Sequence, residues 1–311
     1  MAVALAMPVT AQAIAPPPAA SALAPPDEMV LVLGELASRM TVPVHIQAAG
    51  QGADRSWPFV VDTGAERTVV SRELAARLGL AAGPAVRVVA MSGTSVVPTV
   101  LVPTLSVSTL ARHAVTAPAL DAGHLGAVGM VGIDALQDHA VQIDFAAERM
   151  TLRPSTKRRR PPGRDDIVVT AKSLYGQLIV TDARWRGRRI AVVVDTGTPI
   201  SVGNPALLRM MKTARPAGAM TLVSATGGTL QAQMFGVEGL QVGGIGFSQV
   251  QLAIADVAPF HRFGLTDTPA LMMGMDLLRL FRHVQIDFAN REIRFTIPRG
   301  PLARDPSVSG V

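Results

Sequence analysis

The stretch Phe59–Ser71, FVVDTGAERTVVS, places an Asp-Thr-Gly triplet directly after an apolar run. A second stretch, Ala191–Val202, reads AVVVDTGTPISV and repeats this arrangement. Continuous apolar runs of this length predict buried strands, and a carboxylate at the end of a buried strand is costly unless it has a partner. The repetition indicates that each carboxylate is the partner of the other.

Further landmarks recur in one order on either side of a basic segment. The matching pairs are LSV (Leu105–Val107) with LQV (Leu240–Val242), MVGIDAL (Met130–Leu136) with MMGMDLL (Met272–Leu278), and VQIDF (Val141–Phe145) with VQIDF (Val284–Phe288). The spacing between the copies grows slowly along the chain. The sequence therefore predicts an internal duplication, with two copies of one fold.

Each half has the pattern of β-structure with few helices. Two β-rich segments flank Ser92-Gly93 and two more flank Thr226-Gly227-Gly228, which predicts a hairpin with a flexible tip in each half. Short helices are expected in Ser71–Leu80 and Asn204–Lys212, and around 134–138 and 276–281, with Asp134 and Asp276 as helix caps. The predicted fold class is all-β, with two pseudo-symmetric β-barrel-like lobes.

The chain of 311 residues divides into five predicted parts. These are an Ala/Pro-rich N-terminal segment (1–36), an N-terminal lobe (37–154), an exposed basic linker (155–164), a C-terminal lobe (165–298) and a tail (299–311). The N-terminal segment contains a short apolar run and an Ala-Gln-Ala at Ala11–Ala13, as in a secretory signal, although a basic n-region is missing. We therefore expect a periplasmic or secreted protein, and we expect no transmembrane span. The alternative interpretation of the N-terminal segment is a disordered tail.

The composition limits the kinds of catalysis, cofactor and partner that are possible. The chain has no cysteine, which excludes thiol catalysis, cysteine-ligated zinc and disulfides. The net charge is +6, with much of the excess in Arg153–Arg164. The hypothesis of a nucleic-acid-binding protein would rest only on the basic run Lys157–Arg160. No aromatic residue lies within that run to stack on bases. We therefore expect no nucleic-acid partner. The histidines lack metal-ligand spacing, so no metal or cofactor is expected: His45, His113, His124, His139, His261 and His283.

The duplicated triplets suit hydrolysis by paired carboxylates. If the lobes pack about a pseudo-twofold axis, Asp62 and Asp195 meet and share one proton. The ionised member can then activate a water while the protonated member hydrogen-bonds the scissile carbonyl oxygen. Gly64 and Gly197 allow close approach of backbone to the carboxylates. By contrast, Asp144 and Asp287 lie where a hairpin begins and are expected to be structural.

With its two apolar-apolar-Asp-Thr-Gly motifs and two later apolar-apolar-Gly segments, Met130–Gly132 and Met272–Gly274, the sequence resembles aspartic proteases of the retropepsin and pepsin type. The likeness spans Met40–Pro298 and is greatest to bacterial retropepsin-like proteins with both lobes in one chain. It implies an aspartic endopeptidase acting on peptides or proteins, for which a monomer suffices.

The resemblance also implies roles for individual residues. Asp62 and Asp195 would be catalytic. Thr63 and Thr196 would form hydrogen bonds between the lobes, and the Thr198 hydroxyl would hydrogen-bond the catalytic carboxylate. The hairpin tips (Ser92, Gly93, Thr226 and Gly227) would close over substrate. Glu66 either contacts substrate backbone or forms an ion pair with Arg67 or Arg72.

The sequence also departs from the family pattern. Pepsins carry a tyrosine in the flap, whereas the only tyrosine here is Tyr175, outside both hairpins. This favours the retropepsin-like side. The alternative function is a catalytically silent member that binds peptides or proteins in the same cleft, and the presence of both aspartates argues against it.

Overall fold

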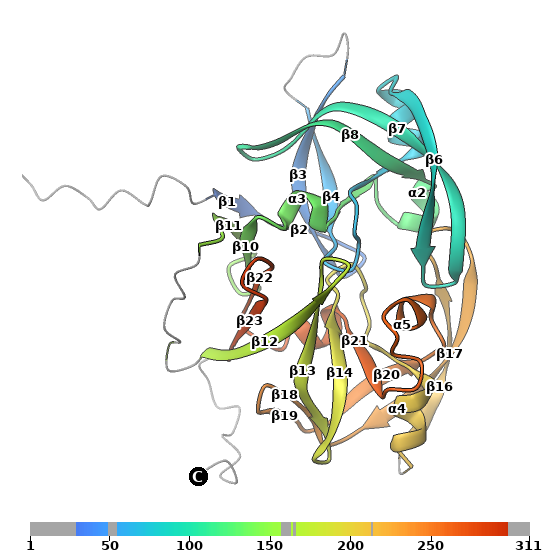
Figure 1. Ribbon diagram of the computed structural model, residues 1–311, viewed down its shortest axis with the longest axis vertical. Coiled ribbons are helices and arrows are strands. Elements are labelled where there is room, and N and C mark those ends of the chain that lie inside the picture. Colours follow the sequence, from blue (N-terminus) through green and yellow to red (C-terminus); the bar gives the residue numbers. More distant parts are fainter. Residues whose placement is uncertain (1–28, 49–54, 157–162, 164–165, 213, 298–311) are drawn as a thin grey trace, which may run out of the picture.

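The computed structural model describes residues 29–48, 55–156, 163, 166–212 and 214–297. They form two β-rich lobes, the N-terminal one in blue to green and the C-terminal one in yellow to red (Figure 1). The basic run Lys157–Arg160, residues 1–28 of the predicted signal-like segment and the tail 299–311 lie outside the described residues. Among the described residues, no helix is long and apolar enough to span a membrane.

The N-terminal lobe is an eight-stranded sheet that closes on itself, because β3 also pairs with β7. Its spatial order is β2 (Gly34–Leu36), β3 (Arg39–Gln47), β4 (Ser56–Val61), β9 (Gly129–Val131), β5 (Val69–Ser71), β8 (Leu110–Leu120), β7 (Gly93–Val107) and β6 (Ala81–Ala90). Strands β6 and β7 are the hairpin predicted around Ser92-Gly93.

The C-terminal lobe repeats this order strand for strand. It runs β12 (Asp166–Leu174), β13 (Gln177–Trp185), β14 (Arg188–Val194), β21 (Ala270–Met273), β15 (Val202–Gly203), β20 (Val250–Ile254), β17 (Thr229–Val237) and β16 (Arg215–Val223). The LQV segment is β18 (Leu240–Val242), which pairs with β13 as its counterpart LSV in β7 pairs with β3. A short β19 (Ile245–Phe247) completes a hairpin with β18. The predicted duplication is confirmed at the level of topology.

One further sheet joins the lobes. Its order is β1 (Met29–Val32), β11 (Arg149–Pro154), β10 (His139–Asp144), β22 (His283–Asp287), β23 (Glu292–Thr296) and β12. The two VQIDF copies lie antiparallel at its centre, with Gln142 opposite Gln285. Equivalent residues facing each other in this way mark a pseudo-twofold axis between the lobes.

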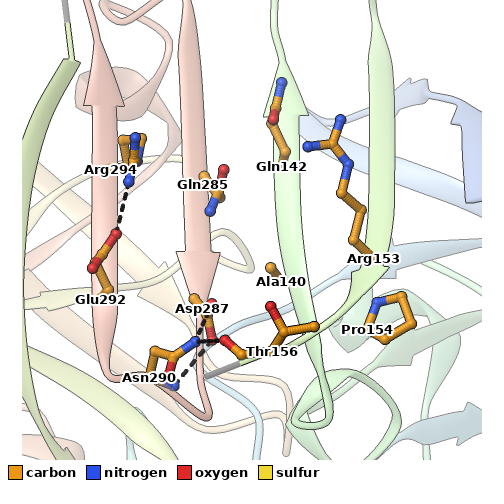
Figure 2. Close-up of a pocket in the computed structure, with 10 residues that line it drawn as sticks. All are labelled: Ala140, Gln142, Arg153, Pro154, Thr156, Gln285, Asp287, Asn290, Glu292 and Arg294. Carbon is orange, nitrogen blue, oxygen red and sulfur yellow. Dashed lines mark hydrogen bonds and ion pairs between the residues drawn. The ribbon is translucent and has the colours of Figure 1, made fainter. Parts of the chain in front are cut away.

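This joining sheet has one apolar and one polar face, as strand alternation requires. Alternate residues such as Val141, Ile143, Val284 and Ile286 are buried in the common core. The other face forms a polar hollow of about 130 Å³, lined among others by Gln142, Arg153 and Gln285 (Figure 2). None of the residues that line it belongs to the Asp-Thr-Gly loops.

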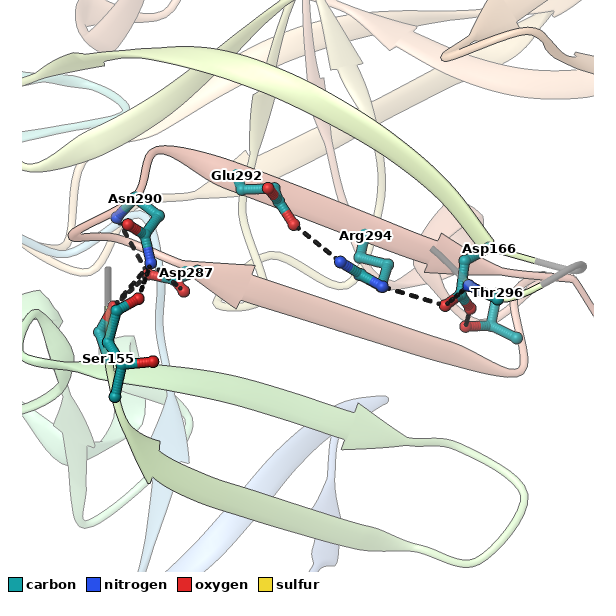
Figure 3. A network of polar contacts seen from close by, with 9 residues as sticks. Ser155, Asp166, Asp287, Asn290, Glu292, Arg294 and Thr296 are labelled. Atoms are coloured by element: carbon teal, nitrogen blue, oxygen red, sulfur yellow. Dashed lines mark hydrogen bonds and ion pairs between the residues drawn. The ribbon is translucent and has the colours of Figure 1, made fainter. Parts of the chain in front are cut away.

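Hydrogen bonds on the polar face fix the ends of the linker (Figure 3). Asp287 accepts from Ser155 Oγ at 2.5 Å and from the Asn290 N–H at 3.0 Å. Arg294 bridges Asp166 at 3.2 Å and Glu292 at 3.0 Å. Asp287 is therefore structural, as predicted.

The helices among the described residues are short. α1 (Arg72–Arg77) and α4 (Pro205–Met210) are capped by the side chains of Ser71 and Asn204, which confirms both predicted helices. α3 (Ile133–Leu136) and α6 (Met275–Leu278) also occur where expected, but the prediction that Asp134 and Asp276 cap them was wrong. The N-caps are Gly132 and Gly274, without a side-chain hydrogen bond. Helices α2 (Ala122–Leu125) and α5 (Ala258–Arg262) were not predicted.

The predicted boundary at residue 36 needs correction. Strand β1 pairs with β11 and strand β2 pairs with β3, so Met29–Leu36 belongs to the folded body. The reason is physical: the side chains of Leu31 and Leu33 are 6% and 5% exposed and join the core.

Asp144 offers a test of the joining sheet. Burial raises the pKa of Asp144, but hydrogen bonds from the Ala147 N–H, from His283 and from the Ala146 N–H together lower it by more than burial raises it. The pKa of Asp144 is therefore lowered overall. A lowered pKa in the folded state gives stability above the unfolded pKa that is lost as pH falls through the folded one. Asp144→Asn should reduce the free energy of unfolding by about 1–2 kcal/mol at neutral pH. Urea unfolding at pH 7 and at about pH 2.5 should show this loss only at pH 7, and an equal loss at both would contradict the assignment.

Candidate active site

Each Asp-Thr-Gly loop begins where a central strand ends. Strand β4 delivers Asp62 and β14 delivers Asp195, and each strand lies parallel to the apolar-apolar-Gly strand of its lobe, β9 or β21. The Asp62 N–H donates to the Val131 carbonyl and the Asp195 N–H to the Met273 carbonyl, both at 3.0 Å. The backbone of each aspartate is thus fixed by a buried parallel ladder.

Asp134 and Asp276 anchor the segment that follows each loop, instead of capping helices. Asp134 accepts from the Thr68 hydroxyl at 2.7 Å, and Thr68 Oγ1 in turn accepts from the Gly132 N–H at 3.2 Å. In the second lobe Asp276 accepts from the Ser201 hydroxyl at 2.6 Å, and Ser201 Oγ accepts from the Gly274 N–H at 2.9 Å. A hydroxyl six residues after Asp62 and after Asp195 is the sequence signal that the prediction missed.

The two threonines of the loops connect the lobes reciprocally, as the resemblance implied. The Thr63 hydroxyl donates to the Val194 carbonyl at 3.0 Å, and the Thr196 hydroxyl donates to the Val61 carbonyl at 2.7 Å. Each hydroxyl also accepts from the backbone N–H of the other threonine at 3.1 Å. Both side chains are buried, so these bonds are shielded from water.

The carboxyl groups of Asp62 and Asp195 hydrogen-bond each other and are 9% and 6% exposed. The glycines predicted to permit close approach do so across the lobes. A Cβ atom at Gly64 would lie 2.6 Å from Asp195 Cγ, and one at Gly197 would overlap the Asp62 carboxyl group. The site is therefore complete within one chain.

The surroundings raise the pKa of both carboxyl groups, and that of Asp195 more. Burial raises the pKa of Asp195 well above 3.8, and the Asp62 charge raises it further. Burial also raises the pKa of Asp62, but N–H bonds from Gly64 at 2.8 Å and Ala65 at 3.0 Å oppose this. The pair can hold one proton between its members, with the negative charge favoured on Asp62.

The predicted role of the Thr198 hydroxyl was wrong. This hydroxyl donates to the Ile200 carbonyl at 3.2 Å, within its own loop. It is the backbone N–H of Thr198 that contributes a bond to Asp195. The turn of the loop brings the amide, not the side chain, toward the carboxylate.

Glu66 forms an ion pair, but with neither Arg67 nor Arg72. Its partner is Arg262 of α5 in the opposite lobe, at 2.6 Å. The Arg262 guanidinium also lies over the ring of Tyr175, 4.0 Å from its centroid. Beside this cluster the Gln177 side-chain amide donates to the Gly64 carbonyl. The partner was out of reach of sequence reasoning because it lies nearly two hundred residues away along the chain.

Both predicted hairpin tips lie against the opposite lobe. The carbonyl of Met91, beside Ser92 and Gly93, accepts from the Ala258 N–H of α5 at 3.0 Å. The side chain of Met91 packs on the apolar cluster of the C-terminal lobe. In return Ala225, beside Thr226 and Gly227, packs on a cluster of the N-terminal lobe.

The tips also meet each other. Gly228 has no room for a Cβ beside Ser92 Oγ, and one at Gly227 would lie 2.7 Å from the His124 ring on α2. Among the described residues, no three His, Asp or Glu side chains form a group that could hold a metal ion.

Comparisons with known proteins agree with this geometry. The family model for aspartyl proteases matches residues 42–135 and 181–277, well over half of the chain and one segment in each lobe. Among solved structures, the aspartic proteinase of Irpex lacteus is similar in fold, with a TM-score of 0.51 and 13% identity. The match covers 89% of this chain and 99% of that one. A search of curated proteins finds no match.

The cross-lobe threonines yield a stability prediction. Thr196→Val keeps the shape of the side chain but leaves the Val61 carbonyl and the Thr63 N–H buried without partners, which should cost about 2–4 kcal/mol of unfolding free energy. Thr196→Ser retains the hydroxyl and should cost about 1 kcal/mol or less. Chemical unfolding of both variants tests this, and equal losses would show that the hydroxyl is unimportant.

The raised pKa of Asp195 predicts a pH-dependent gain. A carboxyl group whose folded pKa exceeds its unfolded value of 3.8 destabilises the fold as pH rises above that value. Asp195→Asn removes this penalty, so the variant should be more stable than wild type at pH 7. The gain should be about 1.4 kcal/mol for each unit of upward shift and should vanish below about pH 3. Thermal unfolding at both pH values measures it, and a folded variant less stable than wild type at pH 7 would overturn the prediction.

Proposed function

We propose that this chain, which belongs to the aspartyl protease family, is an aspartic endopeptidase that hydrolyses peptide bonds with a water held between Asp62 and Asp195. The observation that supports this function most directly is the hydrogen-bonded, buried carboxyl pair built from both lobes. Two such groups with one proton combine a base and an acid in one site.

In the proposed reaction the ionised carboxylate, favoured on Asp62, takes a proton from the water as its oxygen attacks the scissile carbonyl carbon. The protonated carboxyl group, favoured on Asp195, gives its proton to the carbonyl oxygen, and a neutral tetrahedral diol forms. As the diol collapses, Asp62 gives the proton it took from the water to the leaving nitrogen, the C–N bond breaks, and Asp195 takes a proton from one diol hydroxyl as the carboxylic acid product forms. The pair ends with one proton, as it began.

The hairpins support a peptide substrate bound in extended form. Backbone at Ser92-Gly93 and Thr226-Gly227 is proposed to contact a peptide that lies between the tips and the aspartates. Glu66, held by Arg262, is proposed to bind the substrate backbone on the side of the N-terminal lobe. Flap-like hairpins on both lobes, with no tyrosine at either tip, support assignment to the retropepsin-like side of the family.

We further propose that the protein acts outside the cytoplasm, in the periplasm or after secretion. The support is the apolar run and the Ala-Gln-Ala sequence near the N-terminus. Because both aspartates come from one chain, the proposed protease needs no partner chain to complete its site in such a compartment.

The proposal predicts the effect of replacing either aspartate. Asp62→Asn and Asp195→Asn should each reduce kcat by about a thousandfold or more, because one carboxyl group cannot act as base and acid together. Wild type should cleave a mixed peptide library best at acidic to mildly acidic pH and should be unaffected by EDTA. Mass spectrometry of the cleaved library gives the rate and the preferred bonds.

Asp144→Asn is the matched control, because it also replaces one hydrogen-bonded aspartate by asparagine but lies outside the site. It should lower stability and leave kcat near the wild-type value. A folded Asp195→Asn protein that cuts as fast as wild type would refute the mechanism. Binding of peptides without cleavage by wild type would instead identify a catalytically silent member.

A further inference from the structure

Arginines are concentrated at the turn between β13 and β14. Arg184, Arg186, Arg188 and Arg189 fall within six residues, at the end of the C-terminal lobe that lies farthest from the N-terminal lobe (Figure 1). Strand β14 runs through seven residues from this turn to Asp195, so the turn lies roughly 20 Å from the carboxyl pair. These arginines therefore take no part in the site described above.

The arrangement of charge at this turn is unfavourable for the fold alone. Arg184 lies opposite Arg189 in the ladder, and like charges in that position repel each other. The turn residues Arg186 and Gly187 have φ angles of +45° and +79°, a conformation in which arginine is uncommon. Among the described residues, no acid forms an ion pair with any of the four arginines. The turn thus presents positive charge that the described part of the chain does not neutralise.

A hollow of about 330 Å³ lies beside the turn, with Arg186 and Arg215 among the residues that line it. Arg215 of β16 lies opposite Gly236 of β17, and the Arg186 N–H donates to the Gly239 carbonyl at 2.9 Å. Three residues of extended chain span about 10 Å, so the two arginines lie at opposite ends of the short run 236–239. Both are exposed. The hollow has the size of a site for a small molecule.

The Arg186 side chain is held in place at the edge of this hollow. Its guanidinium lies over the Trp185 ring, 5.2 Å from the centroid. A Cβ atom at Gly239 would lie 2.9 Å from Arg186 Cγ, so the stem of the side chain packs on that glycine. Trp185 is 7% exposed and gives a fixed support. A cation that is already positioned loses less conformational entropy when it binds an anion.

Two further polar residues line the hollow, Glu238 and Gln249. Glu238 is the one acid among the lining residues, and it forms no ion pair with Arg186 or Arg215. The lining therefore has a net positive charge. It also offers carboxylate and amide oxygens that can accept hydrogen bonds from hydroxyl groups.

We propose that this hollow binds a small phosphate ester that carries hydroxyl groups, with the phosphate between Arg186 and Arg215 and the hydroxyls toward Glu238 and Gln249. Guanidinium groups from two separate strands suit a tetrahedral phosphate, which presents three acceptor oxygens, better than a planar carboxylate with two. The other arginines of the turn attract the anion over a longer range. A free ester and the headgroup of a glycerophospholipid share this chemistry.

The two tryptophans of the chain provide a test within one sample. Glycerol 3-phosphate is titrated into the full chain with nitrogen-15-labelled tryptophan, and the two indole N–H signals are followed by NMR. Trp185 should show a saturable shift, because Arg186 lies over its ring, and Trp185→Phe assigns the signal. Trp57 is the internal reference, since Arg55 and Arg77 lie over its ring in the other lobe. Equal shifts of both signals would mean unspecific screening of arginine–tryptophan pairs and would overturn the proposal.

Replacement of either arginine should weaken binding. Arg186→Asn removes the cation and introduces an amino acid that this turn favours, so the variant should fold at least as well as wild type. Arg186→Asn and Arg215→Gln should each raise the Kd about tenfold or more. Arg87→Gln, which removes an exposed charge from β6 of the N-terminal lobe, is the matched control and should leave the Kd unchanged. A saturable shift that neither Arg186→Asn nor Arg215→Gln weakens would overturn the proposal.

The choice of probe tests the class and the source of the ligand. Acetate at equal ionic strength should give no saturable shift of Trp185, and binding as tight as that of glycerol 3-phosphate would refute a phosphate site. Sedimentation with phosphatidylglycerol vesicles but not with phosphatidylcholine vesicles, lost in Arg186→Asn, would support the proposal with a membrane headgroup as the source. Binding of neither the free ester nor these vesicles, or of a single-stranded oligonucleotide alone, would overturn it.

This inference does not depend on the proposed function. Asp195→Asn lacks one member of the carboxyl pair but keeps the whole hollow, so it should bind glycerol 3-phosphate with the wild-type Kd. A wild-type chain that cleaves no peptide would leave this test intact. Loss of binding in folded Asp195→Asn would contradict a separate site at the β13–β14 turn.

Discussion

Two carboxyl groups buried in contact with each other are stable only if they hold a proton between them, and this constraint governs the structure around Asp62 and Asp195. Neither lobe alone can supply the contact, so the lobes must meet accurately. The reciprocal bonds of Thr63 and Thr196 meet that need by linking the two loops through backbone and hydroxyl groups. Because the loops are anchored in parallel ladders, the alignment is transmitted to the whole of each lobe.

The same reciprocity recurs away from the carboxyl pair. Each hairpin tip packs on the opposite lobe, and the two VQIDF strands pair across the axis. The lobes differ in charge at two equivalent positions: Arg39 corresponds to Gln177, and Glu66 corresponds to Pro199. A duplicated fold in one chain can vary one copy at a time, which a symmetric dimer of identical chains cannot do.

The elements that the sequence predicted well were those defined by local pattern. The apolar runs before Asp62 and Asp195, the helices that follow Ser71 and Asn204 and the two long hairpins all depend on near neighbours. The errors concern contacts that only the folded chain brings together. For Glu66 the sequence suggested either a contact with substrate backbone or an ion pair with Arg67 or Arg72. The ion pair is instead with Arg262, which comes from a short helix without a clear sequence signal. Asp134 and Asp276 were predicted to act locally as helix caps, although the hydroxyls that bind them, Thr68 and Ser201, recur in the sequence six residues after Asp62 and Asp195.

The burial of the carboxyl pair has a cost in stability. Burial raises the pKa of both aspartates and so penalises their ionisation, which weakens the fold above the pKa of the unfolded chain. In the proposed function the same burial keeps one of the two groups protonated as the acid. Asp144 works in the opposite direction, since its pKa is lowered and its ionised form stabilises the sheet between the lobes. Carboxylates with a lowered pKa, such as Asp144, stabilise the sheet that holds the two lobes together, and the carboxyl pair with raised pKa values depends on that arrangement. Hydrogen bonds distinguish the two classes: Asp144 accepts from a histidine and backbone N–H groups, whereas Asp195 lies against another acid.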